Sequence, residues 1–203
     1  LNLRIATLAA YASKKEHIKN IYPFCRNPLD YVFIKNLNEE IDSSGEFIKK
    51  LYEVLSKSNF IWEPATKTTE GGYHSSGNLF NSTSPIITKL IELIKKEIDA
   101  YRIRYKLSKD YFITKWPKKS KIEAWHVKLL KQGYQTSHIH PSGWLSGCFY
   151  LKIPKVLKKN EGAIKFTLSG YDYPIDKKLP NLIHVPKNLD IALFPSSLFH
   201  HTI

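Results

Sequence analysis

The feature that most restricts the fold of this 203-residue chain is a change in its hydrophobic pattern at Pro117. Upstream, apolar residues recur at three- and four-residue spacing, which is typical of amphipathic helices. Downstream, short apolar runs are separated by Gly, Pro and Asn, which is typical of β-strands and their turns. We therefore expect a mainly β fold with flanking helices, its strands near 121–130, 134–140, 144–153, 163–168, 182–185 and 190–194. Short strands at this spacing indicate a sandwich or a barrel.

The upstream part predicts helices in three places. A loose apolar stripe covers residues 3–20, Asp42-Ser43-Ser44 offers N-cap side chains for a helix that ends near Leu55, and the strongest periodicity covers 85–105. We expect residues 1–28 to be a helical segment from the tail of an upstream domain. Residues 29–203 are expected to be one β-rich domain that is cut short at its C-terminus.

The net charge of +13 raises the question of nucleic-acid binding, because clustered Lys and Arg are the usual footprint of phosphate recognition. However, only four of the 31 basic residues are Arg, which is the side chain favoured for bidentate phosphate and base contacts. The Lys runs are short and scattered. Nucleic acid is therefore not the expected partner, although an anionic partner or cosubstrate stays open.

The cysteines and the hydropathy pattern predict a soluble, cytoplasmic protein. Cys25 and Cys148 lie far apart, and Cys148 falls in an apolar run that we expect to be a buried strand. No apolar stretch approaches the ~20 residues that cross a bilayer, and the N-terminus lacks a signal-peptide pattern.

The residues that point to chemistry are histidines. His138 and His140 are two residues apart, so on an extended strand both side chains project from the same face and can bind one metal ion. Pro141-Ser142-Gly143 then predicts a turn, which places the pair at a strand end. The expected third ligand is His200, which follows an apolar run and a turn. We prefer it to the adjacent His201, which points to the opposite face of an extended segment.

An ordered series of short sequence segments resembles a known family. The downstream segments are 135–147 (QTSHIHPSGWLSG), 161–164 (EGAI) and 194–200 (FPSSLFH), and the upstream ones are 71–73 (GGY) and 78–80 (NLF). Together they resemble the 2-oxoglutarate- and Fe(II)-dependent oxygenases. The nearest likeness is to the branch often joined to tetratricopeptide repeats in marine bacteria and their phages. The resemblance covers roughly residues 60 to 203.

This resemblance implies a double-stranded β-helix, the jelly-roll or cupin-like barrel of the superfamily, with Fe(II) at its mouth and 2-oxoglutarate and O₂ as cosubstrates. His138 and His200 carry over as metal ligands, whereas His140 stands where the family usually has a carboxylate. The family's basic residue for 2-oxoglutarate follows the distal His by about ten positions and is expected beyond residue 203. Tyr150 is our candidate for a cosubstrate contact, and Trp125 and Trp144 are expected to pack.

The leading hypothesis is therefore an Fe(II)- and 2-oxoglutarate-dependent dioxygenase that hydroxylates an unidentified substrate, with His138, His140 and His200 as catalytic metal ligands. The alternative is a cupin-like metal-binding module without oxygenase turnover, which the missing carboxylate favours. A basic nucleic-acid-binding protein is a third, weaker hypothesis. The sequence leaves the substrate and the oligomeric state open.

Overall fold

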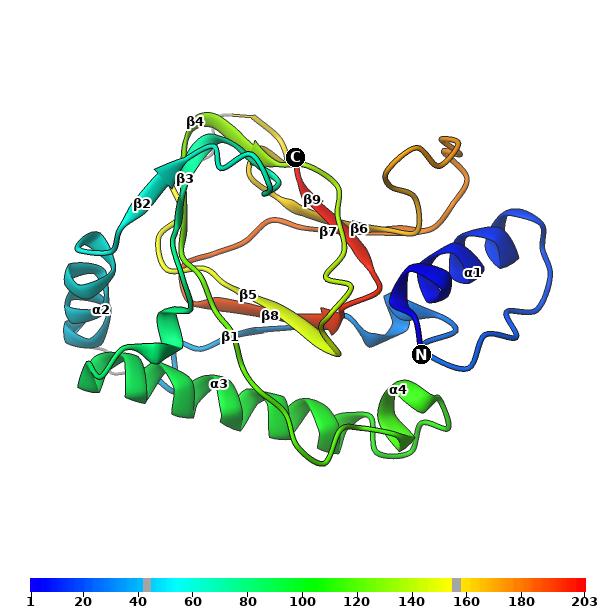
Figure 1. The fold of residues 1–203 in the computed structure, drawn as a ribbon, viewed down its shortest axis with the longest axis horizontal. Coiled ribbons are helices and arrows are strands. Elements are labelled where there is room, and N and C mark those ends of the chain that lie inside the picture. The colour runs from blue at the N-terminus through cyan, green and yellow to red at the C-terminus, as the bar shows by residue number, and fades with distance from the viewer. Residues whose placement is uncertain (42–44, 155–157) are drawn as a thin grey trace.

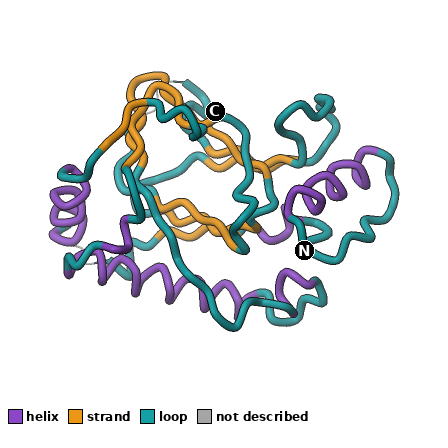
Figure 2. Tube along the Cα trace, viewed as in Figure 1, coloured by secondary structure: helices purple, strands orange, loops and turns teal. Residues whose placement is uncertain are grey.

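A computed structural model describes residues 1–41, 45–154 and 158–203. The described strands pair into three antiparallel sheets, and helices lie on the outside of this β-rich centre (Figure 1, Figure 2). The expected fold class, mainly β with flanking helices, is confirmed. The sheets remain separate ladders of three strands in the described part of the chain, and they do not close into one barrel. Among the described helices, none has both the length and the apolar composition needed to cross a membrane.

The helical elements are α1 (Leu3–Lys15), α2 (Glu46–Ser56), α3 (Pro85–Arg104), α4 (Tyr111–Thr114) and two short 3₁₀ turns, η1 (Pro28–Tyr31) and η2 (Leu79–Asn81). The strands of the first sheet, in spatial order, are β1 (Phe33–Asn36), β8 (Asp190–Pro195) and β5 (Leu145–Phe149). The second sheet contains β2 (Phe60–Trp62), β3 (Thr69–Ser75) and β4 (Val127–Gln135), and the third contains β7 (Asn181–His184), β6 (Ile164–Thr167) and β9 (Phe199–Thr202).

Most predicted elements are present with shifted ends. The first helix ends at Lys15 rather than near residue 20, and the long helix matches its predicted range. Gly45 precedes α2, while the expected cap residues Asp42-Ser43-Ser44 lie outside the described residues. The two strands expected at 121–130 and 134–140 are a single strand, β4. The sequence does not predict β1, β2 or β9, because each has only three or four residues. It does not predict β3 either, because Gly71-Gly72 interrupts the apolar and polar alternation of that strand.

Strand β8 is the centre of the molecule, because both of its faces are buried. Ile191 and Leu193 point to one side and join the apolar cluster that contains residues of α2 and α3. Ala192 and Phe194 point to the other side and pack with residues of the β7-β6-β9 sheet. Successive side chains of a strand alternate between faces, so this one strand joins the helical layer to the facing sheet. Figure 1 shows α3 running along the outer side of the first sheet.

The N-terminal helix packs on this body. Leu3 and Ala6 belong to the helical-side cluster and Ala10 to the other, and the Thr7 hydroxyl donates to the carbonyl of Ser197 at 2.6 Å. Helix α1 thereby covers the turn that connects β8 to β9.

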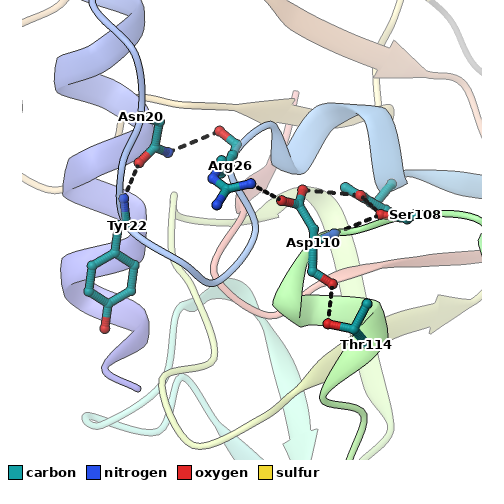
Figure 3. Close-up of polar contacts among 7 residues, drawn as sticks. Asn20, Tyr22, Arg26, Ser108, Asp110 and Thr114 are labelled. Carbon is teal, nitrogen blue, oxygen red and sulfur yellow. Dashed lines mark hydrogen bonds and ion pairs between the residues drawn. The ribbon is translucent and has the colours of Figure 1, made fainter.

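A polar network fastens the segment after α1 to the turn before α4 (Figure 3). The Arg26 guanidinium donates to one oxygen of Asp110 at 3.3 Å, and the Tyr31 hydroxyl donates to the other at 3.1 Å. Tyr31 also contacts Ser108, whose hydroxyl accepts from the Asp110 amide at 3.2 Å. The carboxylate of Asp110 therefore links two segments that are about 80 residues apart in the sequence.

Candidate metal centre

Three histidines from two distant segments meet beside the start of β9. His138 lies just after β4 and forms an isolated antiparallel bridge with His200, each amide donating to the other's carbonyl at 3.1 Å. The His140 amide donates to the Ser196 carbonyl at 3.0 Å, and its own carbonyl accepts from Gly143 at 3.0 Å. The backbone of the β8–β9 turn and of β9 thus fixes the position of the 138–140 segment.

The three imidazole rings lie close enough together to share one ion. Their centroids are 4.2 Å apart for His138 and His200, 5.1 Å for His138 and His140, and 5.0 Å for His140 and His200. One potential ligand atom from each ring lies within 4.8 Å of the others. The structure therefore brings together the three histidines that the sequence predicts as metal ligands. His201 faces away, and its Nδ1 has no hydrogen-bond partner among the described residues.

Each ring is oriented by a hydrogen bond at Nδ1. His138 Nδ1 lies 2.7 Å from the Thr136 carbonyl oxygen, and His200 Nδ1 lies 3.1 Å from that of Leu198. A carbonyl can only accept, so both Nδ1 atoms carry the proton and both Nε2 atoms carry a free lone pair. Hydrogen bonds of this kind fix the tautomer and orientation of metal-binding histidines.

His140 is oriented by a side chain instead. Its Nδ1 lies 2.7 Å from the Ser146 hydroxyl on β5, which in turn lies 2.7 Å from the Ser196 hydroxyl. Ser146 and Ser196 are both buried. Gly143 packs against this pair, because an added Cβ at Gly143 would lie 2.6 Å from the Ser196 Oγ. Side chains or backbone from β5, from the β8–β9 turn and from the turn at Gly143 therefore fix the position of the His140 imidazole.

Burial keeps the three rings neutral. It lowers the pKa of His138 below its usual value, and burial together with the nearby His138 and Lys67 lowers the pKa of His140 to about 4. Burial, aided by the charges of His138 and His140, also holds the pKa of His200 well below its usual value. Neutral imidazoles have the lone pair that a metal ion requires, so this donor set fits a divalent ion without prior loss of protons.

Aromatic side chains form the walls around the rings. Phe194, from the inner face of β8, lies 4.6 Å from His200 between ring centroids. Trp125 lies 5.5 Å from His140 with its ring at 74° to the imidazole. Sequence reasoning gave no role to Ser146 or Ser196, because their partners are six and fifty residues away and no local pattern marks them. Trp144 packs as expected, against Phe24 and Phe112.

The other candidate from the sequence, Tyr150, lies further from the histidines. Its side chain packs against the apolar cluster around Phe166 and Phe194. Burial, followed by the neighbouring Cys148, raises the pKa of its hydroxyl well above the usual value. No contact joins Tyr150 to the three histidines in the described part of the structure. Of the remaining histidines, His74 is buried, His184 Nε2 pairs with Asp190 at 2.8 Å, His126 is half-buried and His17 is exposed.

Three neutral imidazoles around one point suit Fe(II), Zn(II), Cu or Ni, since imidazole is a borderline ligand for all of them. Among the described residues, no carboxylate joins the cluster. Three protein ligands also leave positions free for other molecules, as catalytic rather than structural metal sites do.

Comparison with known proteins agrees with this geometry. Residues 123–203 match the profile of a family described as "Putative 2OG-Fe(II) oxygenase". The matched range contains His138, His140, His200 and Tyr150. No curated protein matches the chain. The resemblance to 2-oxoglutarate- and Fe(II)-dependent oxygenases is thereby confirmed over residues 123–203.

Proposed function

We propose that the protein is an Fe(II)- and 2-oxoglutarate-dependent dioxygenase, an oxidoreductase that hydroxylates a substrate, because residues 123–203 match the 2OG-Fe(II) oxygenase family. The observation that carries the proposal is the convergence of three neutral, oriented imidazoles within 4.8 Å. The family match suggests the reaction class, and the donor set supplies a place for the metal.

His138, His140 and His200 hold the metal ion through Nε2, while Thr136, Ser146 and Leu198 keep the rings in place. Bound Fe(II), with 2-oxoglutarate and O₂, supplies the oxidising chemistry that protein side chains lack. The protein contributes orientation and exclusion of water. Phe194 and the buried cluster behind it close the inner side of the centre, so the centre is accessible from the depression that the three histidines line.

Tyr150 is proposed as a cosubstrate contact. Tyr150 directly follows β5, and the alternation of side chains continued from that strand would place it on the same face as Ser146 and Cys148; Ser146 contacts His140. A tyrosine hydroxyl can donate to a carboxylate, which would explain a polar group at this position in an apolar cluster.

The proposed architecture is the double-stranded β-helix, with residues 29–203 as its domain and 1–28 as a preceding helical segment. The first and third sheets face each other across the cluster of Phe166 and Phe194, and the turn from β8 to β9 carries the chain from one to the other. We also propose a cytoplasmic location, which fits the free thiols of Cys25 and Cys148.

The test is anaerobic Fe(II) binding followed by 2-oxoglutarate turnover, measured as succinate formed. We expect succinate from the wild-type protein and loss of both metal binding and turnover in His138→Ala and His200→Ala. His201→Ala is the matched control, because that side chain lies next to His200 outside the cluster, and it should retain both. Metal binding that survives His138→Ala and His200→Ala would refute the proposed site.

The absence of a carboxylate from the described cluster favours a second candidate function, a cupin-like metal-binding module. A carboxylate would contribute one negative charge that three histidines do not. Metal binding through the histidines with no succinate formed, under any cosubstrate concentration, would select this alternative.

A further inference from the structure

A single lysine lies at the edge of the metal centre, on a turn far from the histidines in the sequence. Lys67 is exposed, and its ammonium lies over the ring of Trp125, 5.8 Å from the centroid. Trp125 in turn contacts His140. Lys67, Trp125 and the three histidines lie along one broad depression that also includes much of α3, β4 and β5. The positive charge is therefore one indole ring away from a proposed metal ligand.

The indole of Trp125, over which Lys67 lies, is held in place by a neighbouring histidine. The imidazole of His74, buried on β3, stacks on the indole at 5.8 Å and 18°. His74 Nδ1 is bound to the Ser75 carbonyl oxygen at 2.8 Å, so the stacked ring is itself fixed. Trp125 is 41% exposed, so part of its indole stays accessible to the Lys67 side chain. A cation over such a ring has a preferred position.

Lys67 has no acidic partner among the described ion pairs. Lys121, by contrast, pairs with Glu123 at 2.7 Å. Burial is the main cause of the lowered pKa of His74 and of His140, and the positive charge of Lys67 adds to the lowering at both imidazoles. The Lys67 ammonium therefore places a positive charge at the edge of the metal centre that no described ion pair compensates.

The donor set increases this imbalance. Three neutral imidazoles leave both charges of a divalent ion uncompensated, whereas a set with one carboxylate would leave only one. A ligand in the open positions therefore experiences the metal charge and the Lys67 charge together. Anionic ligands are favoured by both.

We propose that Lys67, supported by Trp125, binds a carboxylate of a molecule that occupies the depression beside the three histidines. This rests on the proposed function, because the histidines must hold the metal. The carboxylate has two potential sources, the far end of 2-oxoglutarate or a separate acidic small-molecule substrate, and the same lysine serves either.

The experiment uses Mn(II)-loaded protein under anaerobic conditions, so that nothing turns over, and compares wild type with Lys67→Gln. In the first arm, dissociation constants are measured for 2-oxoglutarate and for 2-oxobutyrate, which has the same keto acid group but no far carboxylate. If the cosubstrate is the source, Lys67→Gln weakens 2-oxoglutarate binding about tenfold or more and leaves 2-oxobutyrate unchanged.

In the second arm, the protein is saturated with 2-oxoglutarate and glutarate is added as a carboxylate probe. If a separate substrate is the source, Mn(II) broadens the proton signals of glutarate in the wild-type protein, and Lys67→Gln removes the broadening. Lys67→Arg should keep the effect in whichever arm shows it. Lys49→Gln, a change at an exposed lysine on α2, is the matched control and should change nothing.

The proposal is overturned if Lys67→Gln leaves both arms unchanged, or weakens 2-oxoglutarate and 2-oxobutyrate equally. Neither arm depends on turnover. Carboxylate binding through Lys67 without any succinate formation would therefore refute the oxygenase proposal but support the role of Lys67. Succinate formation by a fully active Lys67→Gln protein with unchanged carboxylate binding would support the oxygenase proposal but refute the role of Lys67.

Discussion

Ser146 is the side chain on which the orientation of His140 depends. It is buried, it contacts His140 Nδ1, and it links that ring to Ser196. We expect Ser146→Ala to reduce metal affinity about 10- to 100-fold, as loss of such an orienting partner commonly does. Calorimetric titration with Zn(II) or anaerobic Fe(II) measures this directly. Ser142→Ala, in the exposed turn nearby, should bind metal like wild type, and equal affinities in all three proteins would contradict the role given to Ser146.

Asp190 gives the protein a pH-dependent source of stability. Burial raises the pKa of its carboxyl, but hydrogen bonds from the Lys187 amide, Asn36 and His184 outweigh burial and hold the pKa below the ordinary value of 3.8. Because the folded-state pKa is the lower one, the stabilisation is complete above the unfolded-state pKa and is lost as pH falls through the folded-state value.

The corresponding prediction compares Asp190→Asn with wild type by urea denaturation. The variant should be less stable by about 1–3 kcal/mol at pH 7, since an ionised acceptor of three hydrogen bonds is removed. The difference should shrink as pH falls below about 4. A difference that stays constant from pH 7 to pH 3 would show that the carboxylate charge contributes nothing.

At the scale of elements, the Asp110 network connects the segment between α1 and β1 to α4 (Figure 3). Asp110→Ala removes the acceptor of Arg26 and Tyr31, so we expect unfolding to require about 1.5–3 kcal/mol less free energy. Thermal and urea denaturation measure the change. Asp172→Ala, at an exposed position, is the control and should stay within about 0.5 kcal/mol of wild type. Equal losses in the two variants would contradict a structural role for the network.

In the whole molecule, a metal at the three histidines would add a link between the 138–140 segment and β9, which backbone hydrogen bonds already join. An ion that binds only the folded state stabilises it by about 2.7 kcal/mol at 100 times its dissociation constant. For a domain of this size that corresponds to a rise in Tm of about 5–10 °C. Scanning fluorimetry with and without Zn(II) should show the rise in wild type and His201→Ala but not in His200→Ala. A rise that persists in His200→Ala would place the ion elsewhere.

The β-rich class, the helix over 85–105 and the choice of the three histidines could be predicted from local patterns in the amino-acid sequence. Period-2 and period-3.6 patterns are local, and the spacing of His138 and His140 places two imidazoles on one face of any extended strand. The short strands β1 and β2 could not be predicted in this way, because they are defined by their partners β8 and β3 rather than by their own residues.

The surroundings of the histidines depend on the tertiary structure and could not be predicted from the sequence. It brought His200 into a bridge with His138, placed Ser146 against His140, and set Lys67 over Trp125. Each of these contacts joins residues on different strands or turns, so the distances depend on how sheets pack and not on sequence spacing. Burial, which keeps the imidazoles neutral, is likewise a property of the assembled core. The residue types alone therefore indicate a metal site, while the distances and contacts within that site depend on the folded structure.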